Sequence, residues 1–391
     1  MKKFLAFLIF TLTIFTGCDK KEISVTVSNS SNENLGQRIV EVNAEEVLPH
    51  LGSQYFFITD SKGQIIISQL TYNNKIIFPA ELNPGETEKY FFHPSDSAFS
   101  YKTKVFGDFY PQRRDDISYE NDKIGVRIYG PGTQAAGEEA YGYDIFFKYP
   151  TDEIVLPQLY HSQTSSDNWE KADSLKKIDS ALAEEFIQSF TYHIDHGKGM
   201  DCYAVGATLG AGTAALIIND SVCYPWCYDK AEILDNGPLR FTARLDFLPH
   251  EISEDYTVTE HRLISLDAGS YLNHTKVWYD DLQSATQIVA GFPRRDEAPA
   301  IIDAENNMVA YPDPTQGSGN GKALLGIYSP TPVDSIFEKY NHILFSAKIN
   351  PEDTLVYNWG YAWDRNEIKS LSEWKVYLLS NKYKYNVKLN K

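Results

Sequence analysis

The fold class is decided by the stretch Phe241-Thr242-Ala243-Arg244-Leu245-Asp246-Phe247, in which apolar and polar side chains alternate. Successive side chains of a strand point to opposite faces of a sheet, so this period of two predicts a strand with one buried face. Residues 123–128 and 342–349 alternate in the same way. Turn signals rich in Gly, Pro and Asn separate such stretches, at residues 83–85, 130–132, 236–238 and 317–321. The chain is therefore predicted to be mainly β.

One segment departs from this pattern. Residues 167–190 are rich in Ala, Glu, Lys and Leu, and steps of three and four separate Leu175, Ile178, Leu182 and Phe186. This spacing predicts one helix with an apolar face, capped at its start by Ser166 or Asp167. A long β pattern with one helical interruption predicts a large antiparallel β-sandwich with a helical insertion.

The first residues resemble an export signal. A basic start, Met1-Lys2-Lys3, precedes an apolar run from Phe4 to Phe15 and then Thr16-Gly17-Cys18. That run is shorter than the roughly 20 apolar residues a membrane span needs, and small residues at a cleavage site complete a signal peptide. We predict a lipoprotein signal peptide over 1–17 and acylation of Cys18, which would hold the protein at the outer membrane. The alternative is an ordinary signal peptide with an incidental cysteine.

The remaining chain is predicted to be a tether over 18–35 followed by a single β-sandwich domain over 36–391. The formal net charge of the full sequence, −17, excludes nucleic acid as a partner, because nucleic-acid binding needs clustered Lys and Arg. An anionic substrate would need a local basic pocket. The chain holds 26 Tyr, 21 Phe and 6 Trp, which suits strand surfaces and also the stacking of sugar rings.

Three cysteines follow the leader: Cys202, Cys223 and Cys227. An odd number in an exported chain permits one disulfide and one free thiol. Cys223 with Cys227 would close a small loop, and a pairing that involves Cys202 is equally consistent with the sequence. No Cys or His pair has the spacing of a structural zinc site.

The densest group of reactive side chains lies in residues 191–203, where Tyr192, His193, Asp195, His196, Lys198 and Tyr203 occur close together. Gly197 and Gly199 let the backbone bend sharply there. The segment is interpreted as a polar active-site loop, against the alternative of a solvated surface loop. A metal site with His193, Asp195 and His196 as ligands is a further alternative, although this spacing matches no recognised metal motif.

Other polar residues are candidates for the same site. Arg127 lies on the polar face of an alternating strand, Arg240 begins another strand after a turn, and His161 precedes the helical segment. No phosphate loop, nucleophile elbow or H-E-x-x-H motif is present, so no cofactor is expected.

Four motifs occur in order along the chain: residues 127–131, residues 192–206, residues 236–240 and residues 264–273. Together they resemble an originally uncharacterised lipoprotein family of Bacteroidetes that is found in gene clusters for polysaccharide breakdown. The resemblance covers most of the chain after the leader, and the histidine-glycine stretch is its most specific part. It implies a galactose-mutarotase-like supersandwich. The helical stretch before Tyr192 departs from the family pattern and would alter the fit of a substrate.

The resemblance also implies an activity. One activity associated with this family is an oligosaccharide dehydratase for ulvan, a sulfated algal polymer of rhamnose and uronic acids. The enzyme removes water from the uronic acid at the non-reducing end and leaves a 4,5-unsaturated sugar. The expected partner is therefore a uronic-acid-containing oligosaccharide.

This elimination needs a base near H5, an acid near O4 and a group that stabilises charge on the carboxylate. We assign His193 or Tyr203 as base and acid, with His196 and Lys198 as further catalytic candidates. Arg240 or Arg127 would bind the carboxylate, and Tyr192, Asp195 and His161 would contact the sugar. Two other classes stay open: a glycan-binding lipoprotein without turnover, and a polysaccharide lyase or glycosidase.

Overall fold

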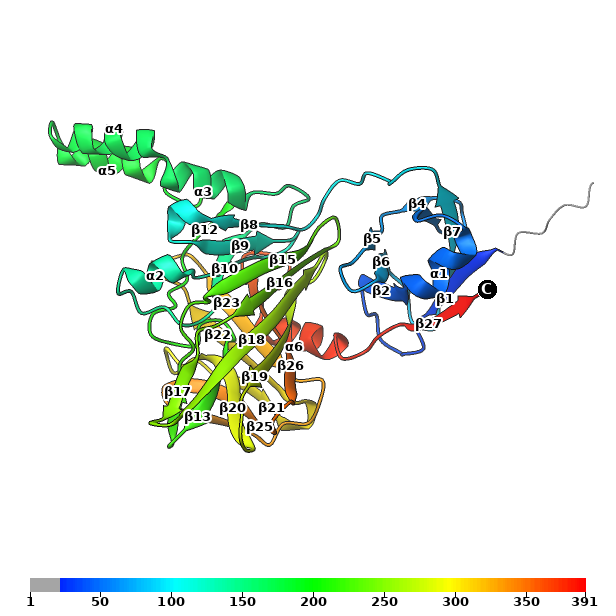
Figure 1. Ribbon diagram of the computed structural model, residues 1–391. Coiled ribbons are helices and arrows are strands. Elements are labelled where there is room, and N and C mark those ends of the chain that lie inside the picture. The colour runs from blue at the N-terminus through cyan, green and yellow to red at the C-terminus, as the bar shows by residue number, and fades with distance from the viewer. Residues whose placement is uncertain (1–21) are drawn as a thin grey trace, which may run out of the picture.

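The computed structural model describes residues 22–391, and Figure 1 shows a large lobe and a small lobe. The predicted signal peptide over 1–17 and the predicted lipid attachment at Cys18 lie outside the described residues. None of the helices within 22–391 is long and apolar enough to cross a membrane.

The large lobe is built from three antiparallel sheets. The nine-stranded sheet has the order β15-β16-β18-β19-β26-β23-β22-β21, and β17 pairs with β18. Its strands are β15 (Lys230–Asn236), β16 (Arg240–Asp246), β17 (His250–Ser253), β18 (Tyr256–Asp267), β19 (Leu272–Asp280), β21 (Ile301–Asp303), β22 (Met308–Pro314), β23 (Lys322–Tyr328) and β26 (Thr354–Trp363).

Two five-stranded sheets complete this lobe. One has the order β14-β13-β20-β25-β24, with β13 (Ala214–Ile218), β14 (Ser221–Cys223), β20 (Thr286–Pro293), β24 (Ser335–Lys339) and β25 (His342–Ile349). The other has the order β12-β11-β10-β9-β8, with β8 (Phe106–Tyr110), β9 (Asp116–Glu120), β10 (Gly125–Ile128), β11 (Asp144–Lys148) and β12 (Gly199–Met200). The prediction of a mainly β, antiparallel sandwich is confirmed.

The small lobe contains a second pair of sheets. A five-stranded sheet has the order β27-β1-β7-β3-β4 and a three-stranded sheet the order β2-β6-β5. The elements are β1 (Ile23–Ser28), β2 (Arg38–Asn43), α1 (Ala44–Leu51), β3 (Tyr55–Thr59), β4 (Ile65–Ile66), β5 (Gln69–Leu70), β6 (Lys75–Ala80), β7 (Thr87–Ser95) and β27 (Asn386–Asn390).

The structure differs here from the expected organisation of a tether to residue 35 and one domain from residue 36. Residues 23–28 form strand β1, whose Val25 and Val27 are fully buried. They belong to a core of the small lobe that shares no residue with the large core. A short polar segment with one alternation, Ile23-Val25-Val27, therefore supplies an interior strand of the sheet, because it buries one face against β2 and β6 residues such as Phe78.

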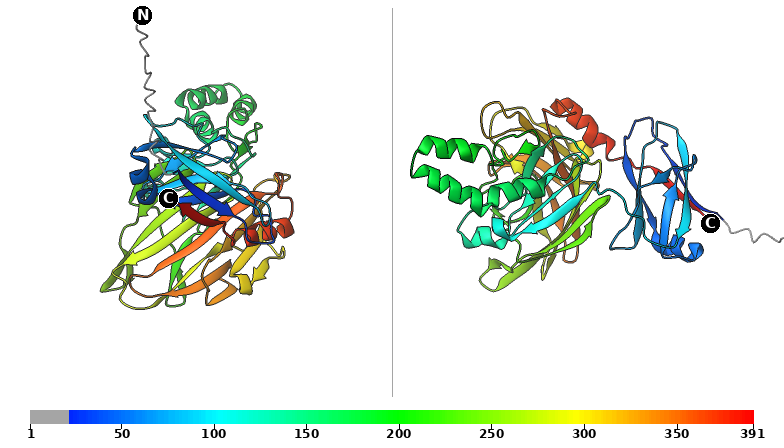
Figure 2. Two further views of the ribbon diagram at one scale, coloured as in Figure 1. Left: turned by 90° about the vertical axis from the view of Figure 1, so that its right-hand side faces the viewer. Right: turned by 90° about the horizontal axis from the view of Figure 1, so that it is seen from above.

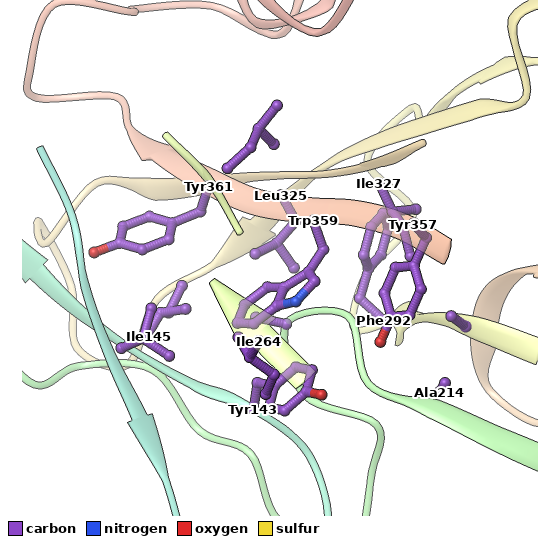
Figure 3. Close-up of a cluster of buried hydrophobic side chains, with 14 of the residues drawn as sticks. Tyr143, Ile145, Ala214, Ile264, Phe292, Leu325, Ile327, Tyr357, Trp359 and Tyr361 are labelled. Atoms are coloured by element: carbon purple, nitrogen blue, oxygen red, sulfur yellow. The ribbon is translucent and has the colours of Figure 1, made fainter. Parts of the chain in front are cut away.

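The core of the large lobe is rich in aromatic side chains, and Figure 3 shows its centre. Trp359 stacks on Tyr143 with ring centroids 4.4 Å apart. The Trp359 indole also donates a 2.9 Å hydrogen bond to Thr275. The alternating stretch of residues 241–247 behaves as expected on its apolar side, since Phe241, Ala243 and Leu245 of β16 are fully buried.

The alternation of β10 does not leave one face open. All four residues of β10, Arg127 included, are buried. Helix α3 (Leu156–Thr164) and the loop around Tyr192 cover the face that the sequence pattern assigns to solvent. Polar residues on that face are therefore interior.

The prediction of one continuous helix over 167–190 is wrong, because this segment forms two helices. Figure 2 shows two antiparallel helices that project from the body, α4 (Ser166–Lys176) and α5 (Ser180–Gln188). Ser165 caps α4 and Asp179 caps α5, so the chain stops and restarts between them. The expected apolar face is split by this turn, and Ile178 at the tip is 79% exposed. The remaining helices are α2 (Pro131–Ala135) and α6 (Leu371–Ser380), with short 3-10 turns at Pro111–Arg113 and Ala304–Asn306.

Within residues 22–391 all three cysteines are free thiols. Neither pairing permitted by the sequence is formed. Cys202 and Cys227 are buried, and Cys223 is partly buried.

Candidate functional site

The histidine-glycine loop connects α5 to β12 and is shaped by Asp195. One carboxylate oxygen of Asp195 accepts the backbone N–H groups of Gly197 at 2.8 Å and Gly199 at 3.1 Å, and the other accepts the hydroxyl of Tyr149 at 2.7 Å. Partial burial opposes ionisation, but these hydrogen bonds outweigh it and lower the pKa of Asp195. Asp195 therefore holds the bend of the loop, which is a different role from the predicted contact with a sugar.

Gly199 is required by this geometry. Its φ of +112° is rare for residues with a Cβ, and an added Cβ would lie 2.0 Å from the carbonyl oxygen of Phe147 in β11. Gly197 also has a positive φ, of +87°, but an added Cβ there would meet nothing within 4 Å. The loop can approach β11 because residue 199 has no side chain.

The histidines of the loop are both accessible. The His193 side chain is 56% exposed, with Nδ1 3.0 Å from the carbonyl oxygen of Asp201 and 3.8 Å from its carboxylate. A carbonyl oxygen only accepts, so Nδ1 carries the proton and the neutral ring has its lone pair on Nε2. In His196 the assignment is reversed, because Nε2 lies 3.1 Å from the carbonyl oxygen of Thr191.

The other side chains of the loop point elsewhere. Lys198 donates a 2.6 Å hydrogen bond to Gln158 of α3, and His161 is exposed on the same helix. Among the described residues, no group of three or more His, Cys, Asp or Glu side chains is arranged to hold a metal ion. The metal-site alternative for His193, Asp195 and His196 is therefore not supported by their geometry.

A buried charge network lies beneath His193. The guanidinium of Arg127 contacts the carboxylate of Asp144 through Nε at 2.8 Å and through Nη2, and the carboxylate of Asp201 at 2.9 Å. Nη1 donates to the Tyr192 hydroxyl at 3.2 Å, and Tyr129 donates to Asp144 at 2.6 Å. We call these residues, Arg127, Tyr129, Asp144, Tyr192 and Asp201, the Arg127 network.

Electrostatics keep Arg127 charged. Burial disfavours the guanidinium cation, but the two carboxylates outweigh it and raise the pKa of Arg127. Burial raises the pKa of Asp144, and the nearby Arg127 opposes that rise. Arg127 is 4% exposed and its three nitrogens all have partners. The prediction that Arg127 offers an open guanidinium to a sugar carboxylate is therefore not supported.

Next to the network, several buried polar atoms have no hydrogen-bond partner. Within the described chain these include Nη1 of Arg113, Oδ2 of Asp116 and the hydroxyl of Tyr160. Burial raises the pKa of Asp116 to about 6, although Arg127 and Arg113 oppose the rise. Buried polar atoms are normally paired with protein or water, so this region has hydrogen-bonding capacity left for water or for a polar solute.

Two predicted residues lie away from this network. Arg240 holds Asp267 with two bonds of 2.5 and 2.8 Å and holds Glu41 of the small lobe at 2.7 Å. It therefore joins the lobes instead of facing a sugar. Tyr203 is buried in the large core, where the guanidinium of Arg295 lies 5.4 Å from its ring centroid. Burial raises the pKa of Tyr203 well above its ordinary value, which disfavours it as a base.

Of the predicted residues, the structure thus joins His193, Tyr192 and Arg127 through Asp201. It adds Asp144, Tyr129, Arg113 and Asp116, which the sequence patterns did not single out. The charged run Arg113-Arg114-Asp115-Asp116 was a possible signal, because it interrupts the β pattern directly before a buried strand. Asp144 carries no such mark, since only its pairing with β10 brings it to Arg127.

Comparison with protein families finds a match over residues 27–390 to a family described as a domain of unknown function, DUF4861. A relative from Formosa agariphila, named uncharacterized protein P7, is 24% identical over an alignment of 406 positions that covers 98% of this chain and 97% of the relative.

Among solved structures, a protein in glycosyl hydrolase family 38 from Enterococcus faecalis matches 95% of this chain with a TM-score of 0.54 and 8% identity. An α-mannosidase from the same species matches with a TM-score of 0.50 and 8% identity, again over 95% of this chain. The chain spans about half the length of these structures, 48% and 46%. At this identity the likeness concerns the fold alone.

Proposed function

The chain belongs to the family described as a domain of unknown function, DUF4861, and from this premise we propose that it is an oligosaccharide dehydratase. Its substrate would be an oligosaccharide of the ulvan type with a uronic acid at the non-reducing end. Loss of water would leave a 4,5-unsaturated uronate without shortening the chain. A lipid-anchored location at the cell envelope, predicted from Cys18, is part of this proposal.

The observation that carries the proposal is the exposed His193 ring, held by Asp201 above a buried arginine. The hydrogen bond at Nδ1 orients the ring and leaves Nε2 free to accept a proton. Asp201 is fixed in turn by its 2.9 Å contact with Arg127. An oriented imidazole at the surface is suited to general base catalysis near neutral pH.

In the proposed reaction, Nε2 of His193 removes the proton from C5 of the uronate. The electrons of that C–H bond form the C4=C5 double bond, the bond from C4 to O4 breaks, and the departing oxygen takes a proton and leaves as water. His196, exposed on the same loop, is the candidate for that acid in its doubly protonated form, because in the neutral ring the one N–H is at Nε2 and faces the carbonyl oxygen of Thr191. Arg113, whose Nη1 has no partner, replaces Arg127 and Arg240 as the candidate for the uronate carboxylate.

The fold and the polar surroundings of the network support this assignment. The chain is similar in fold to the glycosyl hydrolase family 38 protein and the α-mannosidase, although fold alone does not fix activity. The unpaired Nη1 of Arg113 and the unpaired hydroxyl of Tyr160 are a cationic and a neutral donor, the kinds of group that can hold a uronate carboxylate.

The test is to incubate the protein with uronate-ended oligosaccharides and to follow ultraviolet absorbance and product mass. Dehydration gives a new chromophore and the loss of one water at constant chain length. A lyase gives the chromophore with shorter products, a glycosidase gives shorter products alone, and a binding protein leaves the sugar unchanged. Each of the last three results contradicts the proposal.

The matched variants are His193→Ala and His50→Ala, both of which remove an exposed histidine. We expect His193→Ala to lower kcat by about 100-fold or more, the usual contribution of a general base. His50 lies on α1 of the small lobe, and its removal should leave kcat unchanged. Wild-type turnover by folded His193→Ala would remove the central residue of the mechanism.

A further inference from the structure

A cleft of about 250 Å³ opens on the large lobe, away from the histidine-glycine loop. Its walls come from the segment 223–227, the turn 247–250 and strands β18 and β19. Most of the lining is apolar, with Leu216, Phe247, Leu248 and Val258 among the residues that form it. The proposed dehydration makes no use of this cleft.

The rim of the cleft is an exposed aromatic surface. The Trp226 side chain is 41% exposed, and Tyr141 packs edge-on against it with ring centroids 5.6 Å apart. Tyr141 is itself stacked on Tyr224 at 5.2 Å. The indole is therefore braced in place by its neighbours while much of it stays open to solvent. Such a fixed, open ring favours stacking with the apolar C–H face of a sugar.

The floor of the cleft is polar and held rigidly. Glu260 accepts a 2.5 Å hydrogen bond from Nε of Arg262 and a 3.0 Å hydrogen bond from the Tyr279 hydroxyl. The Arg262 guanidinium lies 4.6 Å from the Phe247 ring centroid, so it is packed as well as paired. Each carboxylate oxygen has a further lone pair, which can accept a hydrogen bond from a hydroxyl group.

The hydrogen-bonding groups of this floor limit the kind of ligand that can bind. A carboxylate accepts hydrogen bonds and donates none, so it attracts hydroxyl groups and repels carboxylate or sulfate groups. The Glu260–Arg262 pair carries no net charge, and Arg262 is buried with its Nε used by Glu260. The lining thus favours an uncharged, polyhydroxylated ring and disfavours the uronate that the His193 site would take.

A smaller recess links the cleft to the Arg127 network. It shares Trp226, Cys227 and Phe247 with the cleft and extends to Tyr129. Tyr129 donates its hydroxyl to Asp144, the partner of Arg127. The cleft and the network are therefore neighbours through one tyrosine.

We propose that this cleft is a second carbohydrate-binding site, which takes an uncharged pyranose unit with one ring face on Trp226 and a hydroxyl group on Glu260. The inference rests on the proposed function only for the assumption that the natural ligand is an oligosaccharide. The site is separate from His193, so binding here and turnover there can be measured independently.

The test uses isothermal titration with three uncharged tetrasaccharides, cellotetraose, xylotetraose and mannotetraose, and with tetragalacturonate as the charged comparison. We expect at least one uncharged tetrasaccharide to bind, and Trp226→Ala to weaken that binding about 10-fold, as the loss of one aromatic stack predicts. Trp226→Phe should restore most of the affinity. Phe99→Ala removes a ring of equal exposed fraction, 41%, in the segment between the lobes and should change nothing.

Two results overturn the inference: none of the uncharged tetrasaccharides binds, or folded Trp226→Ala binds them as tightly as the wild type. Both measurements are independent of the dehydratase activity. If the wild type shows no dehydration but loses tetrasaccharide binding with Trp226→Ala, the cleft stands and the proposed reaction fails. If dehydration depends on His193 while Trp226→Ala binds normally, the reaction stands and the cleft proposal fails.

Discussion

Arg127 is a cation almost without contact with water, and two carboxylates lie within hydrogen-bonding distance of it. A single carboxylate would neutralise the guanidinium, so the second carboxylate gives this group of three side chains an excess of negative charge. Asp201, the carboxylate nearer the surface, is the one that reaches His193, so a change of charge in the network would be felt at the exposed ring.

A second buried carboxyl predicts a dependence of stability on pH. Burial raises the pKa of Asp313 from its ordinary 3.8 to about 7, against the opposing charge of Arg295. Between about pH 4 and pH 7 the folded protein holds a proton that the unfolded chain releases. The contribution of Asp313 to stability is therefore complete at low pH and is lost as the pH rises through this window.

We expect Asp313→Asn to remove this pH-dependent part of the unfolding free energy. The free energy of unfolding of the wild type, measured relative to the variant by urea titration, should fall as the pH is raised from about 4 to about 7 and then level off. A difference that stays flat across these pH values would show that Asp313 ionises normally. Asp313→Asn also loses the ion pair with Arg295, which changes the unfolding free energy of the variant by a constant amount above pH 7. The informative quantity is therefore the slope of the free-energy difference against pH.

Single residues also show where sequence patterns are informative. The density of His, Asp, Tyr and Gly in residues 191–203 falls on a surface loop that meets a buried charge network, and its interpretation as an active-site loop stays a prediction. The burial of Arg127 and Arg240 could not be predicted, because each is covered by a segment distant in sequence. Tyr192 covers Arg127, and Glu41 reaches Arg240 from the other lobe. An alternating pattern shows that a strand has one apolar and one polar face, but it does not show which segments of the chain pack on each face.

At the scale of elements, the pairing of β11 with β12 depends on a residue without a Cβ. Phe147 lies opposite Met200 and Lys148 opposite Gly199 in this short antiparallel pair. The pair places the histidine-glycine loop next to the strand that carries Asp144. Loss of the pair would therefore disturb the position of His193 as well as the sheet edge.

Two glycine variants separate these effects. Gly199→Ala and Gly197→Ala both place a Cβ at a positive φ, which costs about 1 kcal/mol. Only Gly199→Ala also collides with the backbone of β11. We expect its unfolding free energy and its turnover to fall well below those of Gly197→Ala. Equal values for the two variants would mean that the loop can move away from β11 without cost.

The helical pair α4–α5 shows a limit of periodicity. Steps of three and four correctly indicated helix over 167–190, but the same steps continue through residues 177–179, where the chain turns back. Asp179 decides the outcome, because its carboxylate caps the N–H of Ala181 at 2.7 Å and starts a new helix. Each helix buries only one side chain, Ala172 or Ala183, so its apolar face could not be assigned from the pattern.

At the scale of the whole molecule, the two lobes are joined by polar contacts around Arg240. Gln69 of the small lobe accepts the backbone N–H groups of Leu239 and Arg240, at 2.7 and 2.8 Å. Tyr72 donates its backbone N–H to Asp235 at 2.8 Å. The ion pair of Arg240 with Glu41 is part of this interface, and its pair with Asp267 lies within the large lobe.

Double-mutant cycles should rank the two ion pairs of Arg240. The Arg240–Asp267 pair makes two bonds and is the less exposed, so we expect its coupling energy to exceed that of Arg240–Glu41, where Glu41 is 44% exposed. For the Glu41 pair the coupling should be at most about 1 kcal/mol. The measurement is urea unfolding of Arg240→Met, Asp267→Asn and Glu41→Gln with their double variants. A larger coupling energy for the Arg240–Glu41 pair would mean that the stronger ion pair of Arg240 is the one across the lobe interface.

Strand β1 lies between β7 and β27, and its partner Asn390 is 366 positions from Ser24. A ribosome delivers β1 among the first structured residues and β27 among the last, so the sheet of the small lobe can receive β27 only after the whole large lobe has been synthesised. Contacts of such long separation form slowly. Until they form, one edge of β1 is an unpaired template for other chains. A polypeptide that ends before residue 386 lacks β27 and keeps that edge of β1 open, so we expect it to aggregate more readily than the full chain.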